Sequence, residues 1–282
     1  MESWLKYFTY MSNLYVIGNG FDLKHGLPSH YSDFACFIRT KNIELYNKVN
    51  ELFPDITRSS LWSNFEEGLG SIDIEKLKIM YNQNSPPNDK FLELHNDLKL
   101  AFREWVILLK SSMCNLKKYY IFNSSDCFIS FNYTNTLEEV YNICNGNILH
   151  IHGYATTGNE EMLFADYIFG HKQPEETSYE NIDSFDYLYK DLKNAFRKKI
   201  NLDVLKNKIN EWKNVVDFEK IVILGHSINP IDDEYFNFLL TTFSDITWAI
   251  DYIDNRDLIK RFCNIKRLEV NGQPSQIEFI HS

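Results

Sequence analysis

The chain contains few cysteines, and their spacing is not that of metal ligands. The five are Cys36, Cys114, Cys127, Cys144 and Cys263. None forms a C-x-x-C pair, and no cysteine–histidine group has the spacing of a structural zinc site, so we expect no bound metal. An odd number of cysteines without a secretion signal is typical of reduced thiols in the cytoplasm, where we place the protein.

Long apolar runs are also missing. No stretch approaches the roughly 20 apolar residues that cross a bilayer, and residues 1–10 (MESWLKYFTY) lack the basic and apolar regions of a signal peptide. Positive charge is scarce as well, since 29 Lys and Arg stand against 39 Asp and Glu, a net charge of −10. We therefore expect no membrane association, and the acidic balance disfavours nucleic acid as a ligand.

The remaining composition is that of an ordinary globular protein, with 44% hydrophobic and 24% charged residues among 282. Short apolar runs alternate with segments of helical periodicity. The runs that we interpret as strands are residues 13–17, 126–131, 148–152, 162–170, 220–225, 247–251, 267–270 and 277–280. Near-continuous apolar strands that alternate with helices predict an α/β fold, in which a mainly parallel sheet carries helices on both faces.

A long helical stretch separates the first two expected strands. Within residues 91–113, apolar side chains recur at steps of three and four residues, which is the spacing of an amphipathic helix. We interpret about residues 35–120 as a helical insertion after the first strand, and about residues 172–218 as a smaller helical insertion. No stretch has the composition of a linker, so we expect a single domain over residues 1–282.

The first expected strand runs directly into a glycine-containing loop, residues 18–22 (GNGFD). Glycines after a first strand let the backbone approach a phosphate closely, although a simple tight turn would also explain them. A carboxylate beside a pyrophosphate would be repelled, so the carboxylate of this loop should face a ribose hydroxyl or a backbone N–H, or else the ligand is a different one. We predict nucleotide-binding roles for Gly18, Asn19, Gly20 and Asp22.

The second expected strand is followed by residues 130–135 (SFNYTN). Ligands of open α/β sheets bind outside the carboxyl ends of the strands. The amide of Asn132 could hold a ribose hydroxyl or a water there. The alternative is that this turn only caps the next helix, through Thr134 or Asn135.

The third expected strand ends in residues 150–153 (HIHG). Residues two apart on a strand face the same side, so His150 and His152 could form a pair of metal ligands. No carboxylate or cysteine at metal spacing accompanies them, and we predict no metal. We assign His150 to packing or to a supporting role.

The clearest buried strand is followed by residues 225–232 (GHSINPID). Gly-x-Ser after a buried strand can bind a ribose or a phosphate through backbone N–H groups and the hydroxyl. The segment is not a nucleophile elbow, because Asn229 stands where G-x-S-x-G requires a second glycine. The predicted ligand-binding residues are Gly225, Ser227 and Asp232, and the last of these could instead cap the following helix.

Two groups of charged residues lie outside these loops. Glu66 and Glu67 follow Trp62 on an expected helix and should face solvent, with the alternative that Glu66 reaches the nucleotide site. The basic run of residues 197–199 (RKK) is most simply a solvated helix face.

Taken together, these stretches resemble the bacteriophage abortive-infection AbiH family. The similar stretches are residues 17–34, 62–69, 131–141, 150–153 and 223–236, so the resemblance spans about residues 13–250. The four motifs also resemble, in their order and placement, those of the sirtuins. That resemblance implies a sirtuin-like, Rossmannoid NAD-binding sheet, with His152 as a catalytic base and Asn132 positioning ribose or water. The two C-x-x-C pairs of the sirtuin zinc ribbon are absent, which implies NAD hydrolysis rather than deacylation.

These resemblances imply an anti-phage effector that hydrolyses NAD to nicotinamide and ADP-ribose when triggered, with no permanently bound cofactor. The implied partners are NAD or a related nucleotide, a phage-derived trigger, and either further copies of the chain or a defence-system partner. Two alternatives remain open. The protein could sense an NAD-like nucleotide without cleaving it, or it could be a toxin that acts on nucleic acid, which the net charge disfavours.

Overall fold

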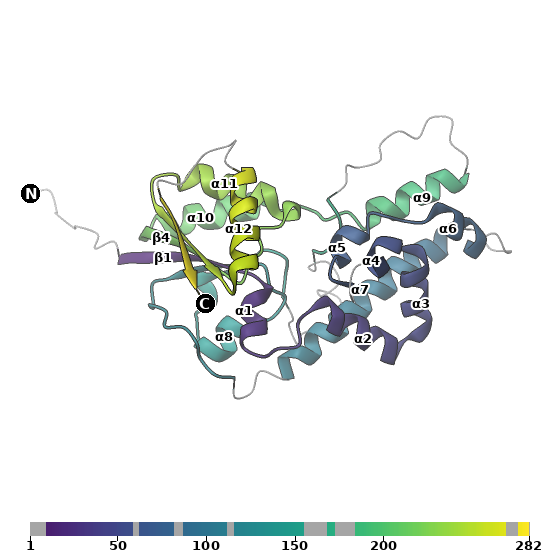
Figure 1. Ribbon diagram of the computed structural model, residues 1–282, viewed down its shortest axis with the longest axis horizontal. Helices are drawn as coiled ribbons and strands as arrows, with labels where there is room; N and C mark the ends of the chain where they lie inside the picture. The colour runs from purple at the N-terminus through teal and green to yellow at the C-terminus, as the bar shows by residue number, and fades with distance from the viewer. Residues whose placement is uncertain are drawn as a thin grey trace, which may run out of the picture. The chain divides into compact units, whose positions relative to one another are not determined.

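The computed structural model describes residues 10–58, 62–81, 87–111, 116–154, 168–172, 184–268 and 276–281. The chain divides into two compact units. The first, which we call the sheet unit, comprises Met1–Gly26, Met113–Ile151 and Ile200–Ser282. The second, the helical unit, comprises Leu27–Ser112 and His152–Lys199. Figure 1 shows the described strands in the sheet unit and a group of helices in the helical unit.

The sheet unit is built on six strands in the order β3-β2-β1-β4-β5-β6, and every neighbouring pair is parallel. The strands are β1 (Tyr10–Ile17), β2 (Cys127–Ser130), β3 (Ile148–His150), β4 (Val216–Leu224), β5 (Thr247–Tyr252) and β6 (Gln276–His281). The predicted parallel α/β fold is therefore confirmed.

Of two further expected strands, one is helical in its described part and the other lies mostly outside the described residues. Arg267 and Leu268 end a helix that contains the buried Ile265, and residues 269–270 lie outside the described residues. Residues 267 and 268 belong to the last turn of an amphipathic helix, which periodicity cannot distinguish from a strand over so short a run. Of residues 162–170, only 168–170 are described, and they form no strand.

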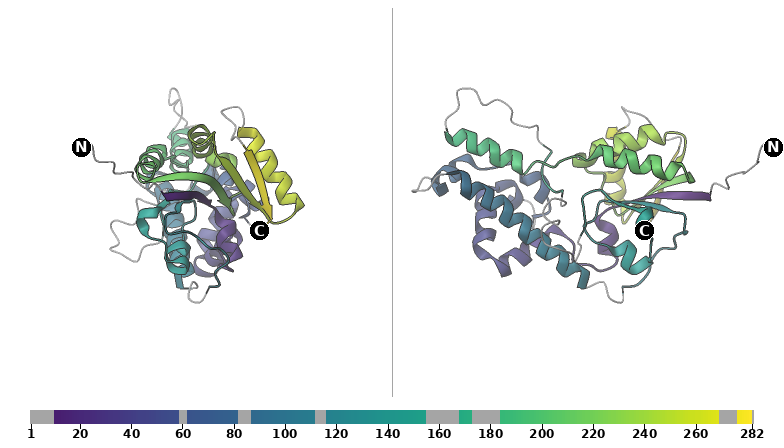
Figure 2. Two further views of the ribbon diagram at one scale, coloured as in Figure 1. Left: turned by 90° about the vertical axis from the view of Figure 1, so that its left-hand side faces the viewer. Right: turned by 180° about the vertical axis from the view of Figure 1, so that it is seen from behind.

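Helices cover both faces of this sheet, as predicted (Figures 1 and 2). They are α1 (Asn19–Lys24), α8 (Thr136–Tyr141), α10 (Leu202–Lys213), α11 (Asp233–Thr242) and α12 (Asn255–Leu268). Leu14 and Val16 of β1 point into an apolar cluster with α10, α11 and α12. Tyr15 and Ile17 alternate with them and join a second cluster with α1 and α8. The alternation of side chains along a strand thus gives the sheet two buried faces.

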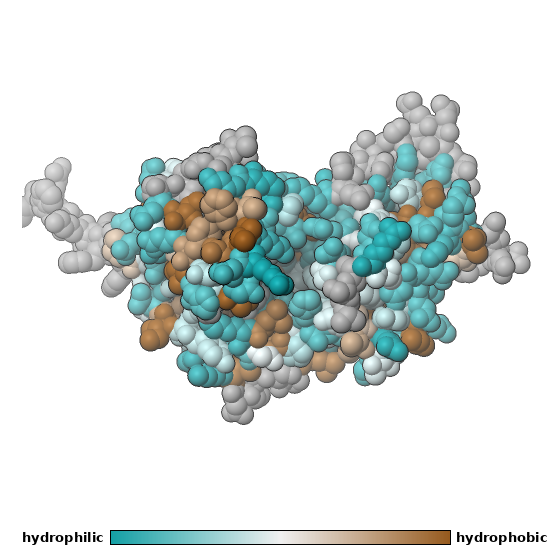
Figure 3. Space-filling model, viewed as in Figure 1, coloured by the Kyte–Doolittle hydropathy of each residue, from teal (hydrophilic) through white to brown (hydrophobic). Residues whose placement is uncertain are grey.

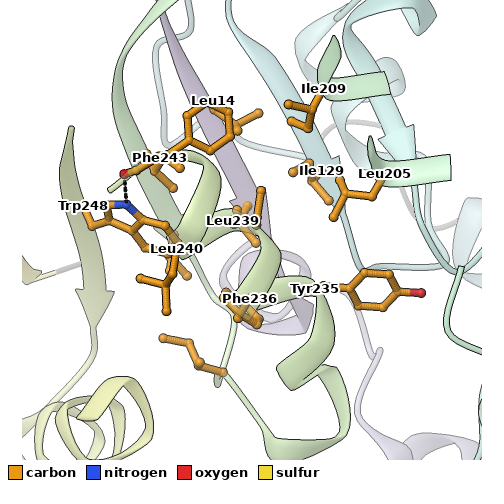
Figure 4. Close-up of a cluster of buried hydrophobic side chains, with 14 of the residues drawn as sticks. Leu14, Ile129, Leu205, Ile209, Tyr235, Phe236, Leu239, Leu240, Phe243 and Trp248 are labelled. Carbon is orange, nitrogen blue, oxygen red and sulfur yellow. Dashed lines mark hydrogen bonds between the residues drawn. The ribbon is translucent and has the colours of Figure 1, made fainter. Parts of the chain in front are cut away.

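The larger cluster forms the main core of the sheet unit (Figure 4). Phe236, Leu239 and Leu240 of α11 are fully buried against the sheet, at the three- and four-residue spacing of an amphipathic helix. Trp248 of β5 is also fully buried, and its indole Nε1–H donates to the Phe243 carbonyl at 3.2 Å. The one polar group of this side chain is therefore satisfied inside the core.

The helical unit is formed mainly by the stretch that the sequence predicts to be helical. Its helices are α2 (Tyr31–Lys41), α3 (Ile43–Leu52), α4 (Pro54–Arg58), α5 (Phe65–Gly68), α6 (Ile74–Tyr81), α7 (Pro87–Ser111) and α9 (Ser184–Ala195). Phe34 lies at its centre, within 5.1–6.0 Å of the rings of Trp62, Phe65 and Phe102. None of the helices described in the chain has the length and apolar character to span a membrane.

Candidate functional site

The strand order of the sheet changes direction between β1 and β4. From β1 the chain continues toward β2 and β3 on one side, whereas β4, β5 and β6 follow on the other. In open α/β sheets, ligands bind outside the carboxyl ends of the strands at such a point. The glycine loop after β1 and residues 225–229 after β4 both leave the sheet here. The structure therefore brings the first and the fourth sequence motifs together.

The glycines of these two loops contact each other through the backbone. The amides of Gly18 and Gly20 donate to the carbonyls of Leu224 and Gly225, at 2.9 and 2.8 Å. A Cβ atom on Gly20 would lie 2.8 Å from the Gly225 Cα, and one on Gly18 would lie 2.4 Å from the His226 Cα. The close backbone approach that the sequence predicts is present, but the group approached is the neighbouring loop.

The loop after β4 is held by side chains of α12. Arg261 donates to the His226 carbonyl, and Asn264 donates to the Ser227 carbonyl at 2.7 Å. Ile228 is fully buried and has a φ of +52°, which is a strained conformation for a β-branched residue. The Ser227 side chain is exposed, as is that of Asn19 on the other loop. These two predicted residues therefore present side chains to solvent at the switch point.

Arg261 and Asp251 form a buried support for this loop that the sequence analysis missed. An Arg261 nitrogen lies 3.2 Å from Asp251, whose other carboxylate oxygen accepts from the Gly225 amide at 2.9 Å. Burial raises the pKa of Asp251, while the Arg261 charge and the hydrogen bond from Gly225 oppose that rise. The sequence offers no signal for this pair, because it joins residues on separate elements that only the fold brings together.

Asp22 faces the protein interior. Its carboxyl group is 1% exposed and accepts hydrogen bonds from the hydroxyls of Thr134 and Thr136. Burial raises the pKa of Asp22 to about 6, although these hydroxyls, Asn132 and the charge of His150 lower it. The partners are thus side-chain hydroxyls, and not the backbone N–H or ribose hydroxyl that the sequence analysis expects. The reason is that the turn after β2 folds against α1.

Asn132 lies between the glycine loop and this carboxyl group. It is 5% exposed, and its Nδ2 donates to the Gly18 carbonyl at 3.1 Å. Its Oδ1 is buried and has no hydrogen-bond partner in the described part of the protein. Asn135 is the N-cap residue of α8 but makes no capping hydrogen bond with its side chain. The structure therefore places Asn132 beside the predicted loop and does not show the capping alternative.

The two histidines of residues 150–153 are not placed as a pair. Strand β3 ends at His150, and His152 follows in a turn, so the alternation of a strand does not apply. His150 contacts Glu138, at 2.8 Å between Nε2 and Oε1. His152 belongs to the helical unit, is 2% exposed, and accepts from the Ile168 amide through its carbonyl. Among the described residues, no group of three or more His, Cys, Asp or Glu could hold a metal ion.

A model of the family described as bacteriophage abortive infection AbiH matches residues 14–90 and 78–252. The chain belongs to the AbiH family. It is therefore an abortive-infection protein of anti-phage defence. No curated protein and no solved structure matches it. The matched residues of this AbiH chain include both loops of the switch point, the turn after β2 and the end of β3.

Asp232 of the AbiH chain stands at the N-cap position of α11 without capping it through its side chain. Its carboxylate lies 3.5 Å from the His226 Nε2, and both side chains are buried. The His226 Nδ1 accepts from the Ile228 amide at 2.9 Å, which keeps the ring proton on Nε2, facing Asp232. Asp232 thus supports the loop after β4 from inside the protein.

In the helical unit of the AbiH chain, two predictions about charged residues are wrong. Lys198 is 6% exposed and donates to the Glu66 Oε2 at 3.0 Å, while Glu66 also accepts from the Tyr31 hydroxyl. Both side chains are largely shielded from solvent. Such shielding is tolerated because the two opposite charges pair with each other. Glu67, Arg197 and Lys199 are exposed, as predicted.

Proposed function

We propose that this AbiH protein binds NAD at the switch point and, during phage infection, hydrolyses the bond between nicotinamide and ribose. The observation that carries the proposal is the strand order β3-β2-β1-β4-β5-β6 with glycine-containing loops at its reversal. This order is that of dinucleotide-binding Rossmann sheets. The motif order along the chain supports a relation to the sirtuins, which is part of the proposal.

The reaction would pass through a transition state with oxocarbenium character at the ribose. Asn132 would position the ribose or the attacking water through its buried Oδ1, and His152 would act as a general base on a ribose hydroxyl or on water. The exposed Asn19 and Ser227 would contact the phosphates and the adenosine side. Gly18, Gly20 and Gly225 would shape the two loops, and the buried Asp22 and Asp232 would hold them.

The activity would be latent, because constitutive loss of NAD would kill the host cell. We infer a phage-derived trigger, a cytoplasmic location, no resident cofactor, and assembly with further copies of the chain or with a defence-system partner. Support for assembly comes from exposed apolar side chains on α12, including Ile259 and Phe262. Figure 3 shows hydrophobic side chains gathered on the face that α12 occupies in Figure 1.

The test is to incubate the purified protein with NAD, with and without phage lysate, and to follow nicotinamide and ADP-ribose by mass spectrometry. We expect both products with lysate. His152→Ala and Asn132→Ala should keep the fold and lower turnover by about 10²–10⁴-fold, the usual effect of losing an acid–base group. His281→Ala, which changes an exposed histidine of β6, is the matched control.

Three outcomes would overturn the proposal that the protein hydrolyses NAD. NAD binding by calorimetry without nicotinamide release would establish the sensor instead. Cleavage of RNA or DNA that is unaffected by His152→Ala would establish the toxin. If triggered protein neither binds nor cleaves NAD, then NAD is not the ligand of this protein.

A further inference from the structure

A histidine–glutamate pair lies at the carboxyl end of β3, next to the residues described above. His150 is the last residue of β3, and Glu138 lies in the first turn of α8. The His150 Nε2 is 2.8 Å from the Glu138 Oε1, and the two side chains are 7% and 16% exposed. The two side chains therefore form a defined hydrogen-bonded contact inside the sheet unit, shielded from bulk water.

The contact determines how the imidazole is protonated. An ionised Glu138 only accepts hydrogen bonds, so it keeps a proton on the His150 Nε2 and makes Nδ1 the basic nitrogen. A buried carboxylate in this position also stabilises the imidazolium that forms when the ring takes up a proton. These are the properties that an acid–base histidine requires.

The pair is connected to the glycine loop. In the register of β2 and β3, His150 lies beside Ser130, and Asn132 follows two residues later. Asn132 in turn donates to the Gly18 carbonyl, and the charge of His150 acts on the carboxyl group of Asp22. The pair thus belongs to the same polar cluster as the residues at the carboxyl ends of β1 and β2.

Two acceptors of this cluster have no partner within the described residues. They are the Oδ1 of Asn132 and the Oε2 of Glu138, and both atoms are buried. A buried acceptor without a hydrogen bond loses its hydration and gains nothing in return. A ligand hydroxyl or a water at the cluster would satisfy them, and each is a hydrogen-bond donor that a neighbouring base could deprotonate.

We propose that His150 and Glu138 are the acid–base pair of this site, acting on a hydroxyl donor that Asn132 holds. The inference rests on the proposed NAD hydrolysis, and it gives the attacking water to His150, which leaves the ribose hydroxyl to His152. In that reaction the water oxygen bonds to the ribose C1′ as its proton passes to the His150 Nδ1. The C1′–N bond breaks, and nicotinamide leaves as the neutral base with the electron pair of that bond. The proton is then released to solvent, and Glu138 stabilises the imidazolium in between.

The test compares His150→Gln and Glu138→Gln with Glu139→Gln, which changes the neighbouring exposed carboxylate on α8. In triggered protein, His150→Gln should lower kcat at least 100-fold and leave the Kd of NAD within about threefold. Glu138→Gln should lower kcat about tenfold. It should leave the Kd of NAD within about threefold, as in His150→Gln. Glu139→Gln should change neither quantity.

If triggered wild-type protein releases nicotinamide and His150→Gln retains kcat within threefold, this pair is structural and the proposed function still stands. Equal losses of kcat in Glu138→Gln and Glu139→Gln would also overturn the pair. A binding measurement tests the pair even if the protein does not cleave NAD. NAD should shift the imidazole NMR signals of His150 in wild-type protein, and the absence of a shift overturns the assignment whether or not NAD is cleaved.

Discussion

Asp22 lies in an environment unlike that of an ordinary surface carboxylate, since it is almost completely buried. Its pKa is raised from 3.8 to about 6, chiefly by burial. An acid whose pKa is higher in the folded than in the unfolded state stabilises the fold in its protonated form. That contribution is complete below about pH 4 and is lost as the pH rises through about 6, a total of about 3 kcal/mol.

The first prediction follows from that sign. Asp22→Asn removes the titration and keeps a side chain that can bond to Thr134 and Thr136. The unfolding free energy of wild-type protein minus that of the variant should therefore fall by about 2 kcal/mol between pH 4.5 and pH 7.5. Urea unfolding at both pH values measures it, with Asp217→Asn, at an exposed position, as control. A difference that does not change with pH would mean that Asp22 has an ordinary pKa in the folded protein.

At the scale of elements, the loops after β1 and β4 form one structure. Hydrogen bonds join their backbones directly, and α12 holds the second loop through Arg261 and Asn264. Gly225 has a φ of +66°, and a Cβ atom there would lie 2.1 Å from the Phe21 amide nitrogen. An added Cβ atom would collide with backbone atoms of the other loop. Neither loop can move aside unless the end of its strand moves as well.

The second prediction concerns Gly20. Gly20→Ala should lower the free energy of unfolding by roughly 1–3 kcal/mol, the usual cost of overpacking. Gly146→Ala is the matched control, because a Cβ atom there would meet only the Cys144 Sγ, at 3.9 Å. Chemical denaturation of the two variants provides the comparison. Equal stability of Gly20→Ala and wild-type protein would show that the loops do not touch as described.

At the scale of the whole molecule, apolar side chains remain at the surface of an otherwise acidic protein. Ile259 and Phe262 lie three residues apart on α12 and are exposed, and the ring of Phe262 lies 6.2 Å from that of Phe279 in β6. Exposed apolar patches often mark sites of protein association. A second copy would meet this patch with the same side chains, as a two-fold interface requires.

The third prediction tests that assembly. Phe262→Lys should reduce the mass measured by light scattering to that of a single 33.4 kDa chain. Ile79→Lys places the same charge at an exposed apolar position of the helical unit and should leave the assembly intact. A wild-type protein that is already a single chain at micromolar concentration would contradict self-assembly through this face.

The sequence by itself determined the class of sheet and the position of the motifs along it. Runs such as residues 220–225 are apolar on both faces, which only a covered parallel strand tolerates, and polar residues after each run had to lie at one edge. Membership of the AbiH family could also be inferred from the sequence, because the matching stretches are contiguous in the chain. The end of β3 at His150 could not be predicted, since local sequence pattern locates the boundaries of elements least reliably.

Only the tertiary structure decided the partners of the polar side chains. Asp22 bonds to Thr134 across 112 residues, and Glu66 bonds to Lys198 across 132. A periodic pattern reports which face of an element is apolar, but it carries no information on which distant element covers that face. For this reason Glu66 and Lys198 are predicted to be solvated, whereas Lys198 is buried and Glu66 is half-buried against it. For the same reason the contact of His150 with Glu138 depends on the packing of α8 beside β3 and leaves no trace in the sequence pattern.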